Sequence, residues 1–198
     1  MRFFLFSFML LALFSCSGGF PEYIAITMSY DEGLVNAESV LDTESLYFEP
    51  VRSFQKVPDE YFLELINDIQ YDDFHLFNEL PIAAFVDSLS QMIFVSEIVN
   101  NDLSYRELFS VSATHFNDIY KDNIIASLPF RYQNILINQY LISYEDNVLV
   151  KVIFSKLNKH KLSNIYMIDY FILADNFTEK MLSVESSIAS IAKKQERY

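Results

Sequence analysis

The sequence lacks the residues on which several common kinds of active site depend. Cys16 is the only cysteine, so no disulfide framework can stabilise the fold, and no thiol after position 16 can serve in catalysis. Two of only three glycines are at positions 18 and 19, which leaves Gly33 alone and excludes a glycine-rich phosphate loop. Tryptophan is absent, and no Gly-x-Ser-x-Gly motif occurs. The thirteen tyrosines and nineteen phenylalanines predict a large hydrophobic core.

Basic residues are scarce in the first two thirds of the chain. Between positions 17 and 130, twenty acidic residues stand against four basic ones, whereas positions 131–198 carry nine basic and seven acidic residues. Nucleic-acid binding needs clustered lysine and arginine, so this acidic part argues against a nucleic-acid partner and against adhesion to anionic lipid. Two interpretations stay open: the acidic residues serve solubility, or they meet a basic partner or a divalent cation.

The N-terminus has the layout of an export signal. Arg2 is followed by an apolar run over positions 3–14 and then by small residues around Cys16. The run is shorter than the roughly 18 apolar residues that a membrane-spanning helix needs. The segment Leu13-Phe14-Ser15-Cys16 resembles the lipobox of bacterial lipoproteins, in which the cysteine is diacylated and becomes the mature N-terminus. Phe14 departs from the usual pattern, where a smaller residue is more common.

This resemblance implies a lipid-anchored protein of the cell envelope. Residues 1–15 would be the signal peptide, residues 16–22 the lipidated Cys16 and a tether, and residues 23–198 a single α+β domain, a length that suits one sizeable core. Ser17, in place of aspartate, resembles the pattern of lipoproteins sent to the outer membrane of a diderm cell. The alternative is an ordinary secretory peptide cut near Ser15 or Ser17, which leaves no lipid.

Periodicity predicts helices and short strands in the first two thirds of the chain. Residues 92–99 fit a helix or a strand equally. The other expected elements are an alternating strand at 23–30, a short strand at 46–48, a helix from Pro58, a helix opened by Pro81, and a helix capped by Asp102 or Ser104 that ends before Pro129.

The last third changes to the period of strands. Gln133–Tyr144, Val148–Phe154 and Asn164–Leu173 read as three antiparallel strands, followed by a helix capped by Asp175 or Asn176. We therefore expect an α+β fold: an antiparallel sheet made of this meander and the N-terminal strand, packed with helices and a C-terminal helix. This order of elements is similar to that of the Mog1/PsbP-like fold over residues 133–191. The helices expected between positions 81 and 128 depart from it, and the resemblance implies a fold without a function.

One constellation of residues suggests metal chemistry. A continuous helix would align Asp68, Asp72, His75 and Glu79, and the later helix would align His115, Asp118 and Asp122. Imidazole and carboxylate side chains from two facing helices can bind zinc, manganese or iron. The ordinary alternative is the solvated face of an amphipathic helix. The candidate metal ligands are Asp72, His75, Glu79, His115 and Asp118.

Together these patterns favour binding or scaffolding over catalysis. We expect no cofactor and no catalytic residue. The expected partners are the membrane, through the lipid on Cys16, and either another envelope protein or a small apolar ligand held between sheet and helices. An immunity-type or stress lipoprotein that blocks a partner would share this description. The rival is a metal-dependent protein or enzyme that uses the histidine and aspartate residues of the two helices.

Overall fold

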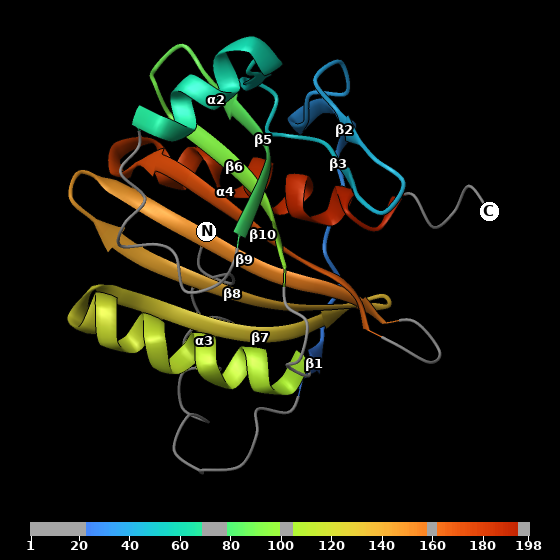
Figure 1. Cartoon of the computed structure of the whole chain (residues 1–198), viewed down its shortest axis with the longest axis vertical. Helices are drawn as coiled ribbons and strands as arrows, with labels where there is room; N and C mark the ends of the chain where they lie inside the picture. The colour runs from blue at the N-terminus through green and yellow to red at the C-terminus, as the bar shows by residue number, and fades with distance from the viewer. Residues whose placement is uncertain (1–22, 69–78, 100–104, 158–161, 194–198) are drawn as a thin grey trace.

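A large, mostly antiparallel sheet dominates the computed structural model, which describes residues 23–68, 79–99, 105–157 and 162–193 (Figure 1). Neighbouring strands are antiparallel except for the parallel pair β1 and β7. In spatial order the strands are β1 (Ile24–Ala25), β7 (Ile124–Tyr132), β8 (Ile135–Tyr144), β9 (Asn147–Leu157), β10 (Leu162–Leu173), β6 (Met92–Ile98), β5 (Glu79–Val86) and β4 (Gln55–Lys56).

The remaining elements cover this sheet on both sides. A small antiparallel ribbon pairs β2 with β3, and η2 and η4 are short 3-10 helices. The bounds are α2 (Asp59–Asp68), α3 (Tyr105–Tyr120), α4 (Ala174–Ser190), β2 (Leu41–Asp42), β3 (Tyr47–Phe48), η2 (Glu32–Leu34) and η4 (Lys121–Asn123). No helix within the described ranges has the length and apolar character that crossing a membrane requires.

Tight turns set the register of the central strands. β7, β8 and β9 form two consecutive hairpins, and the turns between them begin at Gln133 (φ 52°) and Glu145 (φ 51°). Positive φ in a two-residue turn matches the twist of the flanking strands. β10 then pairs with β6, which lies about seventy positions earlier in the sequence, with Ile168 opposite Val95. The sheet therefore joins the two halves of the chain through β6 and β10.

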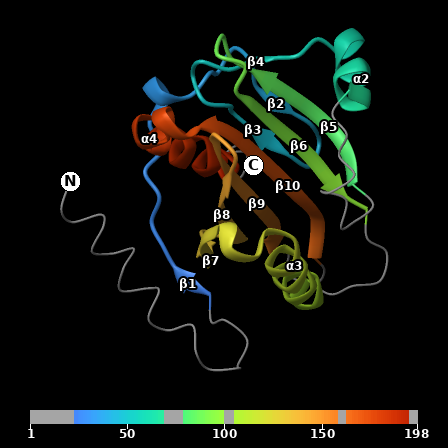
Figure 2. The ribbon, with the colours of Figure 1, turned by 90° about the vertical axis from the view of Figure 1, so that its left-hand side faces the viewer.

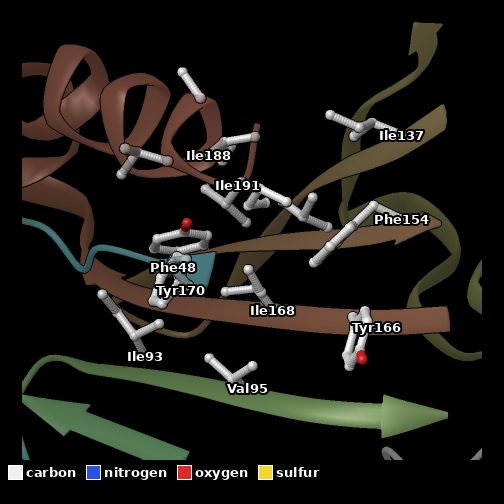
Figure 3. Close-up of a cluster of buried hydrophobic side chains, with 14 of the residues drawn as sticks. Phe48, Ile93, Val95, Ile137, Phe154, Tyr166, Ile168, Tyr170, Ile188 and Ile191 are labelled. Atoms are coloured by element: carbon white, nitrogen blue, oxygen red, sulfur yellow. The ribbon is translucent and has the colours of Figure 1, made fainter. Parts of the chain in front are cut away.

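Each face of the sheet has its own cover. The α4 face is the one covered by α4 and the β2–β3 ribbon, and the α3 face is the one covered by α3 and α2 (Figure 2). On the α4 face, Phe48 packs edge-on against Tyr170. Strand residues such as Ile168, Ile188 of α4 and Ile191 just after α4 belong to the same core (Figure 3). Burial of each aliphatic side chain contributes about 1.5–3 kcal/mol, so this core fixes α4 to the sheet.

Several predicted elements are confirmed. The helix from Pro58 is α2, the helix before Pro129 includes α3, and the hairpin around Glu145 joins β8 to β9. β3, β10 and the C-terminal helix α4 are also present, so the α+β class holds in its coarse form. Residues 92–98, which the sequence left open, form the strand β6.

Other predictions are wrong. Residues 79–86 form the strand β5, not a helix opened by proline, and Pro81 lies at a register shift of this strand. Proline is tolerated there because β4 pairs only with the end of β5, at Phe85 and Val86, so an edge strand with a bulge does not need its N–H. The strand β7 was not expected at all, and the sheet is much larger than a meander with one added strand.

Two local predictions also fail. Only Ile24–Ala25 of the expected strand at 23–30 pairs in the sheet, and Ile24 is exposed. The expected alternation in burial holds only further along, where Ile26 is partly buried and Met28 is buried. α4 has Leu173 at its N-cap with no side-chain capping bond, so neither Asp175 nor Asn176 caps it. The backbone turns directly from β10 into the helix, and Ala174 N donates to Asp146 O instead.

Candidate functional site

A buried ion pair occupies the middle of the α3 face. Lys151 on β9 and Asp169 on β10 are directly opposite each other in register, with Nζ and Oδ2 2.7 Å apart. Their side chains are 0 % and 2 % exposed. Desolvation of an isolated buried charge costs several kcal/mol, which makes this pairing obligatory. Two charges buried at the centre of this sheet face mark it as the principal candidate site.

The Lys151 ammonium is enclosed by soft and aromatic groups. Its Nζ lies 3.2 Å from Met167 Sδ and 5.4 Å from the centroid of the Phe116 ring. Phe116 belongs to α3 and packs edge-on against Tyr140, with ring centroids 4.9 Å apart. A cation above an aromatic face is stabilised by the ring quadrupole. The contact between the Phe116 ring and the Lys151 ammonium thus helps to hold α3 on the sheet.

Glu79 lies on the same face. It is the first residue of β5, opposite Ile98, which packs with Phe116 in the core beneath α3. Burial raises the pKa of the Glu79 carboxyl from its ordinary value of 4.5 to about 8; the Asp169 charge adds to this rise and the Lys151 charge opposes it. The carboxyl is therefore electrostatically coupled to both members of the ion pair.

Two other groups respond to the same charges. Burial raises the pKa of the Asp169 carboxyl, against the opposing charge and hydrogen bond of Lys151. Burial lowers the pKa of the His115 imidazole, the Lys151 charge lowers it further, and Asp118 opposes this. The sheet and α3 thus direct four ionisable side chains toward one region, and Lys151 is the charge that couples them.

Some acceptors in this region lack a donor. Asp169 Oδ1 and Glu79 Oε1 are buried without a hydrogen-bond partner among the described residues, and so is Asn138 Oδ1 further along the α3 face. The other side-chain atom of Asn138, Nδ2, donates to the Tyr140 hydroxyl at 2.6 Å. Buried polar atoms in proteins are nearly always hydrogen-bonded. These three atoms are oxygens of carboxyl and amide side chains, so each can accept a hydrogen bond from a bound group.

The structure separates the predicted metal ligands. Asp72 and His75 lie outside the described residues, as does Cys16. Glu79 begins a strand instead of continuing the helix of Asp68, where α2 ends, and Asp118 is exposed on α3. In the described ranges, no three histidine, cysteine or acidic side chains are grouped as metal ligands would be. The Lys151 charge nevertheless lowers the pKa of both the Glu79 carboxyl and the His115 imidazole.

Sequence reasoning missed Lys151 and Asp169. The available signal was a single charge inside each of two strongly apolar strands, Val148-Leu149-Val150-Lys151-Val152-Ile153-Phe154 and Ile168-Asp169-Tyr170-Phe171. If one face of the strand is assumed to be exposed to solvent, sequence analysis assigns a lone charge at such a position to that face. Here both faces are covered, so the charge must be paired.

A second polar cluster lies at the C-terminal end of α4 and is fully partnered. The Glu49 carboxylate accepts hydrogen bonds from Tyr30, Tyr47 and Lys193, and the Lys193 ammonium lies 4.2 Å from the centroid of the Tyr30 ring. Glu49 N donates to Ser190 Oγ at 2.9 Å. Ser190 and Lys193 join the N-terminal segment to α4 and to the residues after it. We assign this cluster a structural role.

Comparison with known proteins adds no assignment to this geometry. No family model matches the chain, and no curated protein matches its sequence. The function must therefore be argued from the residues of the α3 face and from the N-terminal sequence.

Proposed function

We propose that this protein is a lipid-anchored component of a bacterial cell envelope whose folded part works by binding. Cys16 would carry the lipid, and the described domain would hold a ligand or a partner protein. In a diderm cell, Ser17 favours the outer membrane. Each acyl methylene buried in the bilayer contributes about 0.8 kcal/mol, so two or more chains on Cys16 give stable attachment without a spanning helix.

The binding role is carried by one observation, the unpaired acceptors next to a buried ion pair. Asp169 Oδ1 has no donor among the described residues although its side chain is 2 % exposed. An unsatisfied buried acceptor costs about 1–3 kcal/mol, and charged groups cost more. The Glu49 cluster shows that this chain can satisfy a buried carboxylate completely where only structure is needed. The difference supports a ligand at the α3 face.

The anchor is tested by labelling the full chain in a bacterial host with radioactive palmitate and then separating membranes from soluble protein. We expect label and membrane association in the native chain and in a matched control, Ser15→Ala, which keeps the cysteine. Cys16→Ala should lose both. Unlabelled native protein in the soluble fraction would indicate ordinary secretion and refute the anchor.

The rival function is a metal-dependent protein or enzyme that uses Asp72, His75, Glu79, His115 and Asp118. The Lys151 ammonium disfavours it, because it repels a divalent cation from the same region. Metal analysis of the purified full chain decides between the two. Near-stoichiometric zinc, iron or manganese that is lost on His75→Ala would establish the rival, and trace metal would exclude it.

A further inference from the structure

We propose that α3 is a movable cover, which swings away from the sheet and gives water access to the Lys151–Asp169 ion pair while α4 stays packed on the opposite face. Such a motion goes beyond the binding function proposed above, because it is a conformational step built into the fold. It does not depend on a lipid at Cys16, and it exposes the α3 face without any preformed cavity.

The two faces of the sheet differ in the polarity of their buried side chains. The buried strand residues of the α4 face are all aliphatic or aromatic. A permanent core gains from such packing, whereas a buried polar group costs free energy unless its hydrogen bonds are complete. Every buried polar residue in the described strands lies on the α3 face: Ser96, Asn138, Lys151, Ser155 and Asp169. The composition of the α3 face therefore suits a surface that meets water for part of the time.

Two acceptors on this face lack a hydrogen bond while α3 is closed. Asp169 Oδ1 and Asn138 Oδ1 are buried without a partner among the described residues. The other polar atom of each side chain is paired, Asp169 Oδ2 with Lys151 and Asn138 Nδ2 with Tyr140. Water that reaches the open face satisfies both free oxygens. The open state thus regains hydrogen bonds that the closed state leaves unmade, which lowers the free energy needed for opening.

α3 is held on the sheet by a narrow row of side chains. Among the α3 residues whose side chains are described, the buried ones are Ser112, Phe116 and Tyr120, which are spaced four positions apart on one line of the helix. Phe116, in the middle, packs edge-on against Tyr140 and lies 5.4 Å from Lys151 Nζ. One member of this row is polar, and the central ring rests partly on a charge.

α4 is held by apolar packing and by hydrogen bonds together. Ile188 lies in the same core as Phe48 of the β2–β3 ribbon. Ser187 Oγ donates to Glu49 O at 2.7 Å, and Glu49 N donates to Ser190 Oγ at 2.9 Å. The segment around Glu49 therefore fastens α4 from the side, so α4 provides the fixed reference against which the motion of α3 is measured.

The hinge lies at the C-terminal end of α3. The 3-10 helix η4 joins α3 directly to β7, and its first residue, Lys121, has φ 40°. Tyr120, just before it, is buried. Hinges in proteins are a few residues at the ends of elements that absorb the change in φ and ψ. The opening is therefore a swing about Lys121 that lifts Phe116 from the sheet.

The test compares the reactivity of thiols at two neighbouring positions of β9. Ile153 and Val152 are both 0 % exposed, but Ile153 packs with Phe116 beneath α3 and Val152 lies in the core beneath α4. Ile153→Cys and Val152→Cys are made separately in the full chain in mild detergent, and iodoacetamide labelling is followed on the β9 peptide. We expect the Ile153→Cys thiol to react at least about a hundredfold faster, because local opening needs less free energy than global unfolding.

A substitution on the α4 face separates opening from unfolding. Phe48→Ala destabilises the α4 core, so it should speed labelling of the Val152→Cys chain about tenfold or more. Labelling of the Ile153→Cys chain should not change, because the swing of α3 leaves the α4 core intact. Low urea acts in the same way, since it promotes reactions that expose much surface. Equal rates in the two chains, or equal acceleration of both by Phe48→Ala, would overturn the proposal.

A measurement on the unsubstituted chain removes any dependence on the folding of the cysteine variants. Lys151 is 0 % exposed, so an acetylating ester reaches its amine only when the α3 face is open. Mass spectrometry of the β9 peptide should show acetylation of Lys151 at a rate that low urea leaves unchanged. Acetylation that begins only where circular dichroism shows the chain unfolding would overturn the motion and make the α3 face a permanent polar core. Palmitate labelling of Cys16 decides the anchor independently of either result.

Discussion

Glu79 should make the protein less stable as the pH rises. The folded chain holds the proton of this carboxyl up to about pH 8, whereas an unfolded chain loses it near the ordinary pKa of 4.5. Between these values the folded state binds more protons than the unfolded state, so the free energy of unfolding falls with rising pH. Below pH 4.5 both states are protonated and the loss is absent. Above pH 8 the loss is complete.

The size of this effect follows from the difference between the two pKa values. About 3.5 pKa units at about 1.36 kcal/mol each give an upper limit of about 5 kcal/mol. Part of the Glu79 side chain reaches solvent although Oε1 is enclosed, so we expect about 2–3 kcal/mol. Glu79→Gln keeps the shape and cannot ionise. The stability gain of the variant over the native chain should therefore be about 2–3 kcal/mol larger at pH 9 than at pH 5.

Urea unfolding followed by far-ultraviolet circular dichroism at pH 5 and pH 9 measures this difference. Comparing the variant with the native chain at each pH cancels the titration of all other groups. The reasoning would be refuted if the native and variant chains differed in free energy of unfolding by the same amount at pH 5 and pH 9, within about 0.5 kcal/mol.

Three further predictions concern packing and the polar clusters. Lys151→Met should cost about 3–5 kcal/mol in urea unfolding because it strands a buried carboxylate, and adding Asp169→Leu should recover most of the loss; a double variant no more stable than the single one would contradict this. Glu49→Gln should cost about 2–3 kcal/mol at pH 6 and less at pH 3. Burial raises the pKa of Glu49, but its two tyrosine donors and Lys193 lower it more, so its contribution disappears as the pH falls below about 4.5; an equal cost at both pH values would argue against it. Phe48→Ala should cost about 3–5 kcal/mol in the same assay, because the ring is fully enclosed, and a loss below 1 kcal/mol would mean that the α4 face is loosely packed.

The sequence predicts elements well where one periodicity extends over many residues. α3 and α4 show a helical stripe, and β9 alternates valines from Val148 onward, so local pattern and final structure agree. It fails at β5, where a short apolar run after Pro81 carries no decisive period. The outcome there depends on β6, a partner that local pattern cannot reveal. The likeness to Mog1/PsbP-like domains stays a prediction.

The candidate site was predictable only in part. Glu79 and His115 were selected for helical spacing, and the Lys151 charge affects the pKa of both, but Glu79 lies on a strand. Lys151 and Asp169 became visible only when the register placed them side by side on adjacent strands. Pairing between strands is a tertiary property, and a single sequence does not encode it in its local spacing.

The central claim is that a lipid holds this domain in the envelope, and the intact mass of the membrane-extracted chain tests it most directly. The account predicts a polypeptide that begins at Cys16 and carries an acyl-sized mass increment, which disappears in Cys16→Ala. An unmodified mass, with the protein in the soluble fraction, would contradict the account and make the acidic domain a diffusible secreted protein.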